Sequence, residues 1–232
     1  MILLKIAFLL TEIILIWHLA TVDFLNEFKC IYIFGKKGSG KTTLLCKNAR
    51  KDIEKGWSVY STEDFVYTKR NKKTHKMETF ETIHIDPESV PYYSFPPYSS
   101  IYVDEASLIW SNRDTFSGTN KESLKAMAEL CQLLRRKKLK MTLASVTFSG
   151  TDKKIRDCMD ELFICRCIRT VTFAKRLTLR PIVVHPTSDA PATITDDIIT
   201  DPAVLYPFGG LKITFIPKWI KCYKSYLVDS ND

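Results

Sequence analysis

From Phe28 onward, the chain alternates short apolar runs with amphipathic or polar segments. Apolar runs of four to eight residues bounded by turn residues are typical of buried strands, whereas apolar residues spaced three and four apart are typical of helices. The pattern predicts helices over Lys41–Asp52, Asn120–Arg136 and Lys153–Asp160. It predicts strands over Phe28–Phe34, Trp57–Tyr60, Ser100–Val103, Lys140–Val146, Glu161–Ile168, Val171–Arg180 and Leu211–Ile216. This alternation favours an α/β fold with a mostly parallel central sheet.

Two polar or proline-rich segments interrupt this alternation. Tyr67–Met77 is basic, and we expect it to be a solvated loop or helix surface. Pro91–Pro97 is expected to be a linker that leads into the next strand.

The first 26 residues contain the longest apolar stretch of the chain. As a helix, Ile2–Val22 reaches roughly 31 Å, about the thickness of a hydrocarbon core. Its polar residues are spread around the helical wheel and form no wide polar face, which argues against a helix lying on a membrane surface. These polar residues are Lys5, Thr11, Glu12, His18 and Thr21.

Two interpretations of this helix remain open. One is a single membrane-spanning anchor over residues 1–26, with residues 27–232 on the cytoplasmic side. Glu12 near its middle costs about 2.5–3.5 kcal/mol on insertion, and each surrounding Leu, Ile or Phe offsets about 0.3–0.6 kcal/mol. The other is a helix buried in the fold or against a partner protein. We expect the membrane anchor.

Composition narrows the class of protein. With 45% hydrophobic and 26% charged residues, the 232-residue chain is neither mainly disordered, nor collagen-like, nor a polytopic membrane protein. The net charge of +8 is compatible with an anionic partner, either nucleic acid or lipid headgroups. The seven cysteines show no repeated metal-ligand spacing, which predicts buried, reduced thiols on the cytosolic side of a membrane.

A glycine-rich segment directly follows the first predicted strand. Residues 35–42 read GKKGSGKT and match the pattern G-x-x-x-x-G-K-[ST] in full, with an apolar strand before it and a helix after it. The glycines let backbone N–H groups turn around a polyphosphate, and the helix N-terminus adds positive potential there. In such a P-loop, Lys41 reaches the β- and γ-phosphates of ATP and the Thr42 hydroxyl ligates Mg²⁺.

Two acids end a later apolar strand, in the run Ile101-Tyr102-Val103-Asp104-Glu105. Asp104 is placed to hold Mg²⁺ through water, and Glu105 to polarise the attacking water as a general base. Together with the P-loop, these acids predict a Mg²⁺-dependent ATP hydrolase. The expected fold is that of a P-loop NTPase, a three-layer α/β/α sandwich with an additional N-terminal hydrophobic helix.

Further catalytic candidates lie beyond these two motifs. Thr147 ends the strand Lys140–Val146 and is either a sensor of the γ-phosphate or a solvated strand end. Arg113 and Arg156 are candidate arginine fingers, which stabilise transition-state charge and often come from a neighbouring subunit. Taken alone, each of these arginines is favoured as a surface or structural residue over a catalytic one.

With these motifs, the chain resembles the zonula occludens toxin-like P-loop ATPases, the assembly ATPases of filamentous phages, which are related to the FtsK/HerA class of DNA-pumping motors. The landmarks lie between Ile31 and Cys165 and read IYIFGKKGSGKTTLL, GWSVYS, SIYVDEASLIWSNRD, LLRRKKLKMTLASVT and DKKIRDCMDELFICR. The resemblance implies virion assembly and export of single-stranded DNA through a membrane. It implies that nucleotide is bound by Gly35, Lys36, Lys37, Gly38, Ser39, Gly40, Lys41, Thr42 and Thr43.

The expected function is therefore a membrane-associated, homo-oligomeric ATPase that drives phage assembly and single-stranded DNA export or packaging. One alternative is a nucleotide-binding assembly scaffold with little turnover, and a weaker one is a soluble P-loop kinase. The basic stretches Lys69–Lys76 and Arg135–Lys140 can contact phosphates or lipid headgroups, or can simply be solvated surface.

Overall fold

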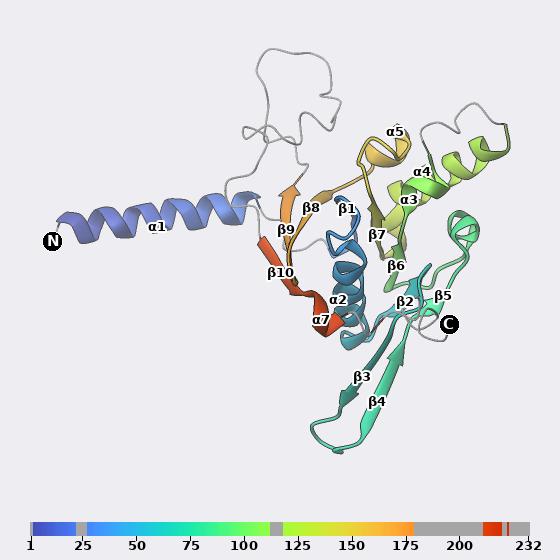
Figure 1. Cartoon of the computed structure of the whole chain (residues 1–232). Helices are drawn as coiled ribbons and strands as arrows, with labels where there is room; N and C mark the ends of the chain where they lie inside the picture. Colours follow the sequence, from blue (N-terminus) through green and yellow to red (C-terminus); the bar gives the residue numbers. More distant parts are fainter. Residues whose placement is uncertain (1, 22–26, 112–117, 179–210, 220–221, 223–232) are drawn as a thin grey trace, which may run out of the picture.

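Among the described residues, eight strands form one sheet of mixed direction (Figure 1). The computed structural model describes residues 2–21, 27–111, 118–178, 211–219 and 222. The sheet order is β10-β9-β8-β1-β7-β6-β2-β5, and β3 and β4 form a separate pair. The strands are β1 (Cys30–Phe34), β2 (Ser58–Ser61), β3 (Val66–Arg70), β4 (Met77–Glu81), β5 (Ile83–His84), β6 (Ser99–Val103), β7 (Leu139–Ser145), β8 (Glu161–Ile168), β9 (Val171–Thr178) and β10 (Leu211–Phe215).

The predicted mostly parallel sheet is confirmed. Each neighbouring pair from β8 through β1, β7, β6 and β2 to β5 runs parallel. Antiparallel pairing is confined to β9 and β10 at one edge of the sheet. Parallel strands need crossover connections, and helices supply most of them here.

Helices cover both faces of the sheet, so the predicted three-layer α/β/α arrangement is also confirmed (Figure 1). One face carries α2 (Lys41–Glu54) and α7 (Ile216–Trp219), and the other carries α3 (Ala106–Ile109), α4 (Gly118–Lys137), α5 (Lys153–Arg156) and the 3₁₀ helix η1 (Pro87–Tyr92). Successive side chains of a strand point to opposite faces. In β1, Tyr32 therefore packs in the α4 layer, whereas Ile31 and Ile33 pack with Leu44 of α2.

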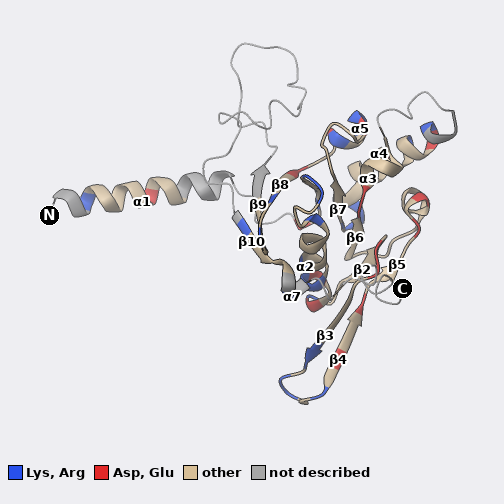
Figure 2. Ribbon diagram, in the orientation of Figure 1, with Lys and Arg blue, Asp and Glu red and all other residues tan. Residues whose placement is uncertain are grey.

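The basic segment Tyr67–Met77 differs from the expectation of a solvated loop or helix surface. It is part of a β-hairpin, in which β3 pairs antiparallel with β4. The hairpin extends away from the sheet, and its basic residues are marked in Figure 2. Alternating half-buried and exposed positions in β4, together with stacking of Tyr67 on Phe80 at 6.1 Å, stabilise it as a strand pair.

The N-terminal segment forms helix α1 (Ile2–Thr21), which extends away from the sheet (Figure 1). Within the described part of the chain, no helix has both the length and the apolar character that a membrane span requires. The predicted single-pass anchor and the membrane localisation are therefore wrong. Lys5 and Glu12 interrupt the apolar residues, and a charge near the middle of a span costs about 2.5–3.5 kcal/mol. The side chains described in α1, Lys5–Leu15, are exposed, so they are not buried in the fold either.

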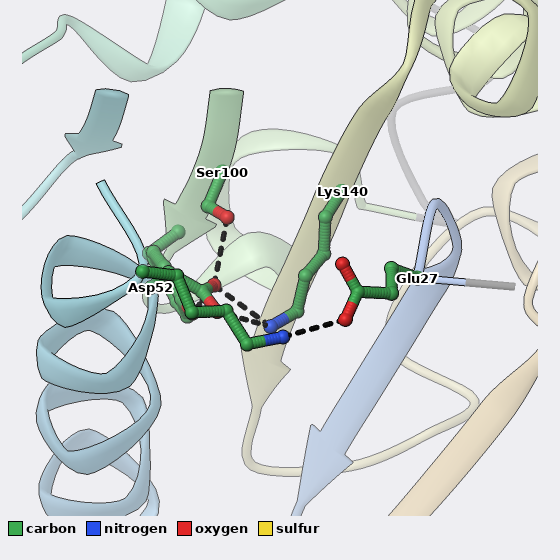
Figure 3. A network of polar contacts seen from close by, with 6 residues as sticks. Glu27, Asp52, Ser100 and Lys140 are labelled. Atoms are coloured by element: carbon green, nitrogen blue, oxygen red, sulfur yellow. Dashed lines mark hydrogen bonds and ion pairs between the residues drawn. The ribbon is translucent and has the colours of Figure 1, made fainter. Parts of the chain in front are cut away.

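One buried carboxylate fastens the C-terminal end of α2 to the sheet (Figure 3). Both oxygens of Asp52 lie close to Lys140 Nζ of β7, at 2.7 and 3.0 Å. The same carboxylate accepts hydrogen bonds from Ser100 Oγ at 2.7 Å and Tyr102 OH at 2.5 Å, both in β6. Burial lowers the pKa of Lys140, although the charge of Asp52 acts in the opposite direction. The carboxylate thus links α2 to two central strands.

Replacing Lys140 by Met is expected to lower the free energy of unfolding by about 3–5 kcal/mol, because the carboxylate of Asp52 then stays buried without a counter-charge. The midpoint of urea denaturation measures this change. The matched control is Lys55→Met, which removes an ion pair to Glu27 of the same 2.7 Å length whose side chains are 51% and 53% exposed. That control should lose less than about 1 kcal/mol. Equal losses in the two variants would show that burial does not set the strength of the Asp52 pair.

Candidate nucleotide-binding site

The site lies at the carboxyl edge of the central strands. β1 and β6 pair with opposite edges of β7 in parallel register, so the segments that follow all three strands emerge at the same edge. The P-loop follows β1, Asp104 follows β6, and Thr147 lies just beyond β7. The backbone N–H of Gly35 donates to the carbonyl of Ser145 at 3.3 Å, which joins the start of the P-loop to the end of β7. In open α/β sheets, this edge is where ligands bind.

The two predicted Mg²⁺ ligands are in direct contact. Thr42 Oγ1 donates to Asp104 Oδ2 at 2.5 Å, across 62 residues of sequence. Two further hydrogen bonds hold Asp104 in place. Its backbone N–H donates to Thr62 Oγ1 at 3.0 Å, and its Oδ1 accepts from the backbone N–H of Glu105 at 2.9 Å. A hydroxyl and a carboxylate oxygen are ligands that Mg²⁺ accepts, so the donor set fits this ion.

The P-loop contains polar groups that fit a bound phosphate chain. Lys41 is buried, and its Nζ donates to the carbonyl of Gly35 at 3.0 Å and to that of Lys36 at 3.5 Å. Ser39 Oγ is buried without a hydrogen-bond partner among the described residues. Buried polar groups are normally paired. A phosphate oxygen would satisfy this hydroxyl and the ammonium group, so the loop fits the triphosphate of ATP.

At Gly40 of the P-loop, both the backbone conformation and a neighbouring side chain exclude any residue with a Cβ. Its φ of 82° lies in the left-handed region, which disfavours residues with a Cβ. A Cβ built there would also collide with the side chain of Thr172 in β9. The antiparallel strand β9 therefore closes on the loop just before α2 begins.

Of the other predicted catalytic residues, Glu105 contacts this centre through its backbone N–H, which donates to Asp104 Oδ1. Glu105 is exposed and has a φ of 54° at the start of α3. Thr147 is also exposed, and its carbonyl accepts from Tyr32 OH at 3.0 Å. The guanidinium of Arg156 lies 5.2 Å over the ring of Phe148. Their catalytic roles stay predictions.

The remaining predicted site residues divide into two groups. Arg113 lies outside the described residues, so its role as an arginine finger is also still a prediction. Lys36, Lys37 and Gly38 lie on the exposed side of the P-loop, whereas Thr43 is buried behind it. The predicted segment Gly35–Thr43 follows β1 and continues into the first turn of α2, and its nucleotide contacts stay a prediction.

Sequence reasoning missed the residues that follow β2. Thr62 supports the backbone of Asp104, and Glu63 is half-buried beside the same carboxylate. Burial raises the pKa of Glu63, and the nearby negative charges of Asp104 and Asp64 raise it further. Both residues lie within three positions of the end of the predicted strand Trp57–Tyr60. Had the pairing of β2 with β6 been known, the position of Thr62 and Glu63 after β2 would have placed them beside Asp104.

A scan against protein-family models found no match, and a search of curated proteins found none. Among solved structures, the chain is similar to the crystal structure of the N-terminal domain of zonular occludens toxin from Neisseria meningitidis. The identity is 16% and the TM-score 0.50, over 84% of this chain and 98% of that one. The genome packaging NTPase B204 of Sulfolobus turreted icosahedral virus 2, in complex with ATP-gammaS, matches at 14% identity and TM-score 0.42, over 62% of this chain and 77% of that one.

Flagellar accessory protein FlaH from Methanocaldococcus jannaschii matches at 17% identity and TM-score 0.42, over 65% of this chain and 78% of that one. At these identities, the likeness to the zonular occludens toxin domain concerns the fold alone. At that level it confirms the P-loop NTPase fold and the family resemblance expected from the sequence.

Gly40→Ala is expected to destabilise the protein more than Gly56→Ala. Both glycines have nearly the same φ, 82° and 83°, so both variants bear the cost of a Cβ in the left-handed region, about 1–2 kcal/mol. Only the Cβ at Gly40 meets Thr172, because nothing lies within 4 Å of the corresponding position at Gly56. Urea denaturation gives the difference in unfolding free energy. Equal losses would mean that β9 does not press on the P-loop.

Glu63→Gln is expected to stabilise the protein at pH 7 when Mg²⁺ and nucleotide are absent. The pKa of Glu63 is raised above 4.5 in the folded state. In the pH range between the unfolded-state pKa and this raised folded-state pKa, the folded state binds more protons than the unfolded state. Its contribution to stability therefore falls as the pH rises through that window, and Gln removes the loss. Thermal unfolding at pH 7 and at about pH 4 should show a gain that disappears in acid. The exposed Glu88→Gln is the control, and a gain of equal size at both pH values would contradict the assignment.

Proposed function

We propose that this chain is a Mg²⁺-dependent ATP hydrolase that drives phage assembly and the transport of single-stranded DNA. The contact between Thr42 Oγ1 and Asp104 Oδ2 carries the proposal, because it joins the two motifs at one point. The P-loop holds the triphosphate next to that point. Its buried Ser39 hydroxyl and the ammonium of Lys41 supply donors to the phosphate oxygens.

Each residue has a distinct part in the proposed reaction. Lys41 exchanges its carbonyl acceptors for β- and γ-phosphate oxygens and neutralises their charge. Thr42 and Asp104 would hold Mg²⁺, which neutralises charge on the phosphate oxygens when it is bound. Glu105 accepts a proton from the water that attacks the γ-phosphorus, while the bond to the β–γ bridging oxygen breaks. Exposure of Glu105 leaves its carboxylate accessible to that water.

The assembly role is supported by the run of landmarks from Ile31 to Cys165, which extends well beyond the generic P-loop pattern. The same resemblance supports single-stranded DNA as the transported partner. We expect the chain to form a homo-oligomer in which a neighbouring copy supplies the arginine finger. Within its own chain, the guanidinium of Arg156 lies over the ring of Phe148.

Lys41→Ala and Glu105→Gln separate binding from turnover. Lys41→Ala should lose most of its ATP affinity in a fluorescent-nucleotide titration, because the cation that faces the phosphates is gone. Glu105→Gln should bind ATP normally and hydrolyse it about 10²–10⁴-fold more slowly, the usual contribution of a general base. The exposed Glu88→Gln serves as the matched control for loss of one carboxylate and should retain full activity.

Two outcomes would overturn parts of this proposal. If the parent protein and Lys41→Ala bind ATP with the same negligible affinity, the chain is not an ATPase. If Glu105→Gln abolishes hydrolysis while phage assembly in cells continues, the chain acts as a nucleotide-binding scaffold. Stimulation of hydrolysis by single-stranded DNA is the result expected of the proposed transport role.

A further inference from the structure

The β3–β4 hairpin presents a concentrated positive charge at its turn. Between Val66 and Met77 the sequence contains five lysines and arginines, one histidine and no acidic residue. We define the hairpin tip as Arg70 together with the three lysines of the turn, Lys72, Lys73 and Lys76. All four side chains are exposed. In Figure 2 the turn is marked by basic residues at the end of the hairpin furthest from the sheet.

The three turn lysines differ in ion pairing from the other lysine of the hairpin. Among the described residues, no ion pair involves Lys72, Lys73 or Lys76. Lys69 differs, because its Nζ lies 2.8 Å from Glu54 Oε1 of α2. The paired lysine therefore lies at the end of the hairpin next to α2, whereas the unpaired ones gather at the turn. A partner that contacts the turn would meet uncompensated charge.

The turn is held in one conformation before any partner arrives. Asn71 Oδ1 accepts from the backbone N–H groups of Lys73 and Thr74, at 2.8 and 3.2 Å. The backbone N–H of Asn71 donates to the carbonyl of Lys76 at 2.8 Å, and the N–H of His75 donates to the carbonyl of Asn71 at 2.9 Å. A preorganised binding surface loses less conformational entropy on association than a flexible one.

The hairpin is also anchored on the helix that follows the P-loop. The guanidinium of Arg50 lies 4.4 Å over the ring of Tyr67, and Glu54 binds Lys69. Both Arg50 and Glu54 belong to α2, which begins at the P-loop lysine Lys41. The hairpin tip and the nucleotide site are therefore attached to the same helix.

We propose that the hairpin tip binds the phosphate backbone of nucleic acid. Lysine and arginine bind phosphates without reading sequence, and the turn contains no Phe, Tyr or Trp to stack on bases. Insertion into a membrane surface uses several large apolar side chains, whereas Met77 is the large apolar side chain that this turn exposes. The choice of nucleic acid as the partner rests on the proposed function in DNA transport.

The test is fluorescence anisotropy of labelled single-stranded DNA with the full chain and with the triple variant Lys72→Ala/Lys73→Ala/Lys76→Ala. The variant should bind on the order of 100-fold more weakly at 0.1 M salt, and its slope of log K against log salt should be shallower by about two, or about 0.7 for each lost phosphate contact. DNA stimulation of hydrolysis should fall with it. Basal ATPase activity should not change, which shows that the variant is folded.

The matched control removes the same charge from α4 and α5, in Arg136→Ala/Lys137→Ala/Lys153→Ala, whose three side chains are exposed. DNA affinity of this control should stay close to that of the parent. Equal weakening in the two triple variants would overturn the inference, since it would show a general charge effect. Failure of the parent to bind DNA would also overturn it.

A second binding partner is tested with vesicles of phosphatidylcholine and phosphatidylserine. If the hairpin variant loses vesicle binding and keeps DNA binding, the tip binds lipid headgroups and the inference is wrong. Failure of the proposed ATPase function can be distinguished from failure of the hairpin inference. A parent protein that binds DNA through the tip but shows no ATP turnover would retain the hairpin surface and reject the proposed function.

Discussion

The contact between Thr42 and Asp104 depends on the parallel register of three strands, and the site depends on that contact. β1 and β6 are both neighbours of β7, so the segments after β1 and β6 are separated by the width of one strand. α2 begins directly after the P-loop and brings its first-turn hydroxyl across that gap, to 2.5 Å from the carboxylate. A shift of one residue in either pairing would turn the side chains of the strand to the other face and separate the two groups.

Helix α2 connects the Thr42–Asp104 contact to the sheet and to the β3–β4 hairpin. Its first turn meets Asp104, and its last turns hold the buried carboxylate of Asp52 against Lys140. Its outer side holds the hairpin through Arg50 and Glu54. A helix fastened at both ends moves as a unit with the strands that hold it, because packed interiors deform little. The proposed nucleotide site at one end of α2 and the hairpin are therefore joined through one rigid element.

Charged groups differ in their surroundings between the interior, the carboxyl edge of the sheet and the hairpin turn. In the interior, Lys140 is paired with Asp52, and burial lowers the pKa of that lysine. At the carboxyl edge of the sheet, Glu63 and Asp104 lie close together, and their mutual repulsion contributes to the raised pKa of Glu63. A divalent cation at this edge would relieve that repulsion. The lysines of the hairpin turn, which form no ion pair within the described part of the chain, lie away from the site.

Sequence alone was sufficient for features that local patterns encode. The apolar run before Gly35, the glycine-rich turn and the helix after it identify the P-loop, and the acids after Val103 identify its partner. Periodicity also predicted the layered α/β fold. It gave the wrong membrane interpretation of α1, and it missed the strands at the two ends of Tyr67–Met77 while the turn between them is exposed as expected. Apolar content and basic charge do not by themselves specify the surroundings of a segment.

Tertiary structure alone decided which distant residues meet. Asp52 and Lys140 are 88 residues apart, and each by itself has the appearance of a solvated charge on a helix or strand. Thr62 and Glu63 join the site only because β2 lies beside β6, and β9 reaches Gly40 only because the chain turns back antiparallel after β8. Local patterns specify the period and ends of an element, whereas the order of strands in a sheet results from packing between segments that are far apart in sequence.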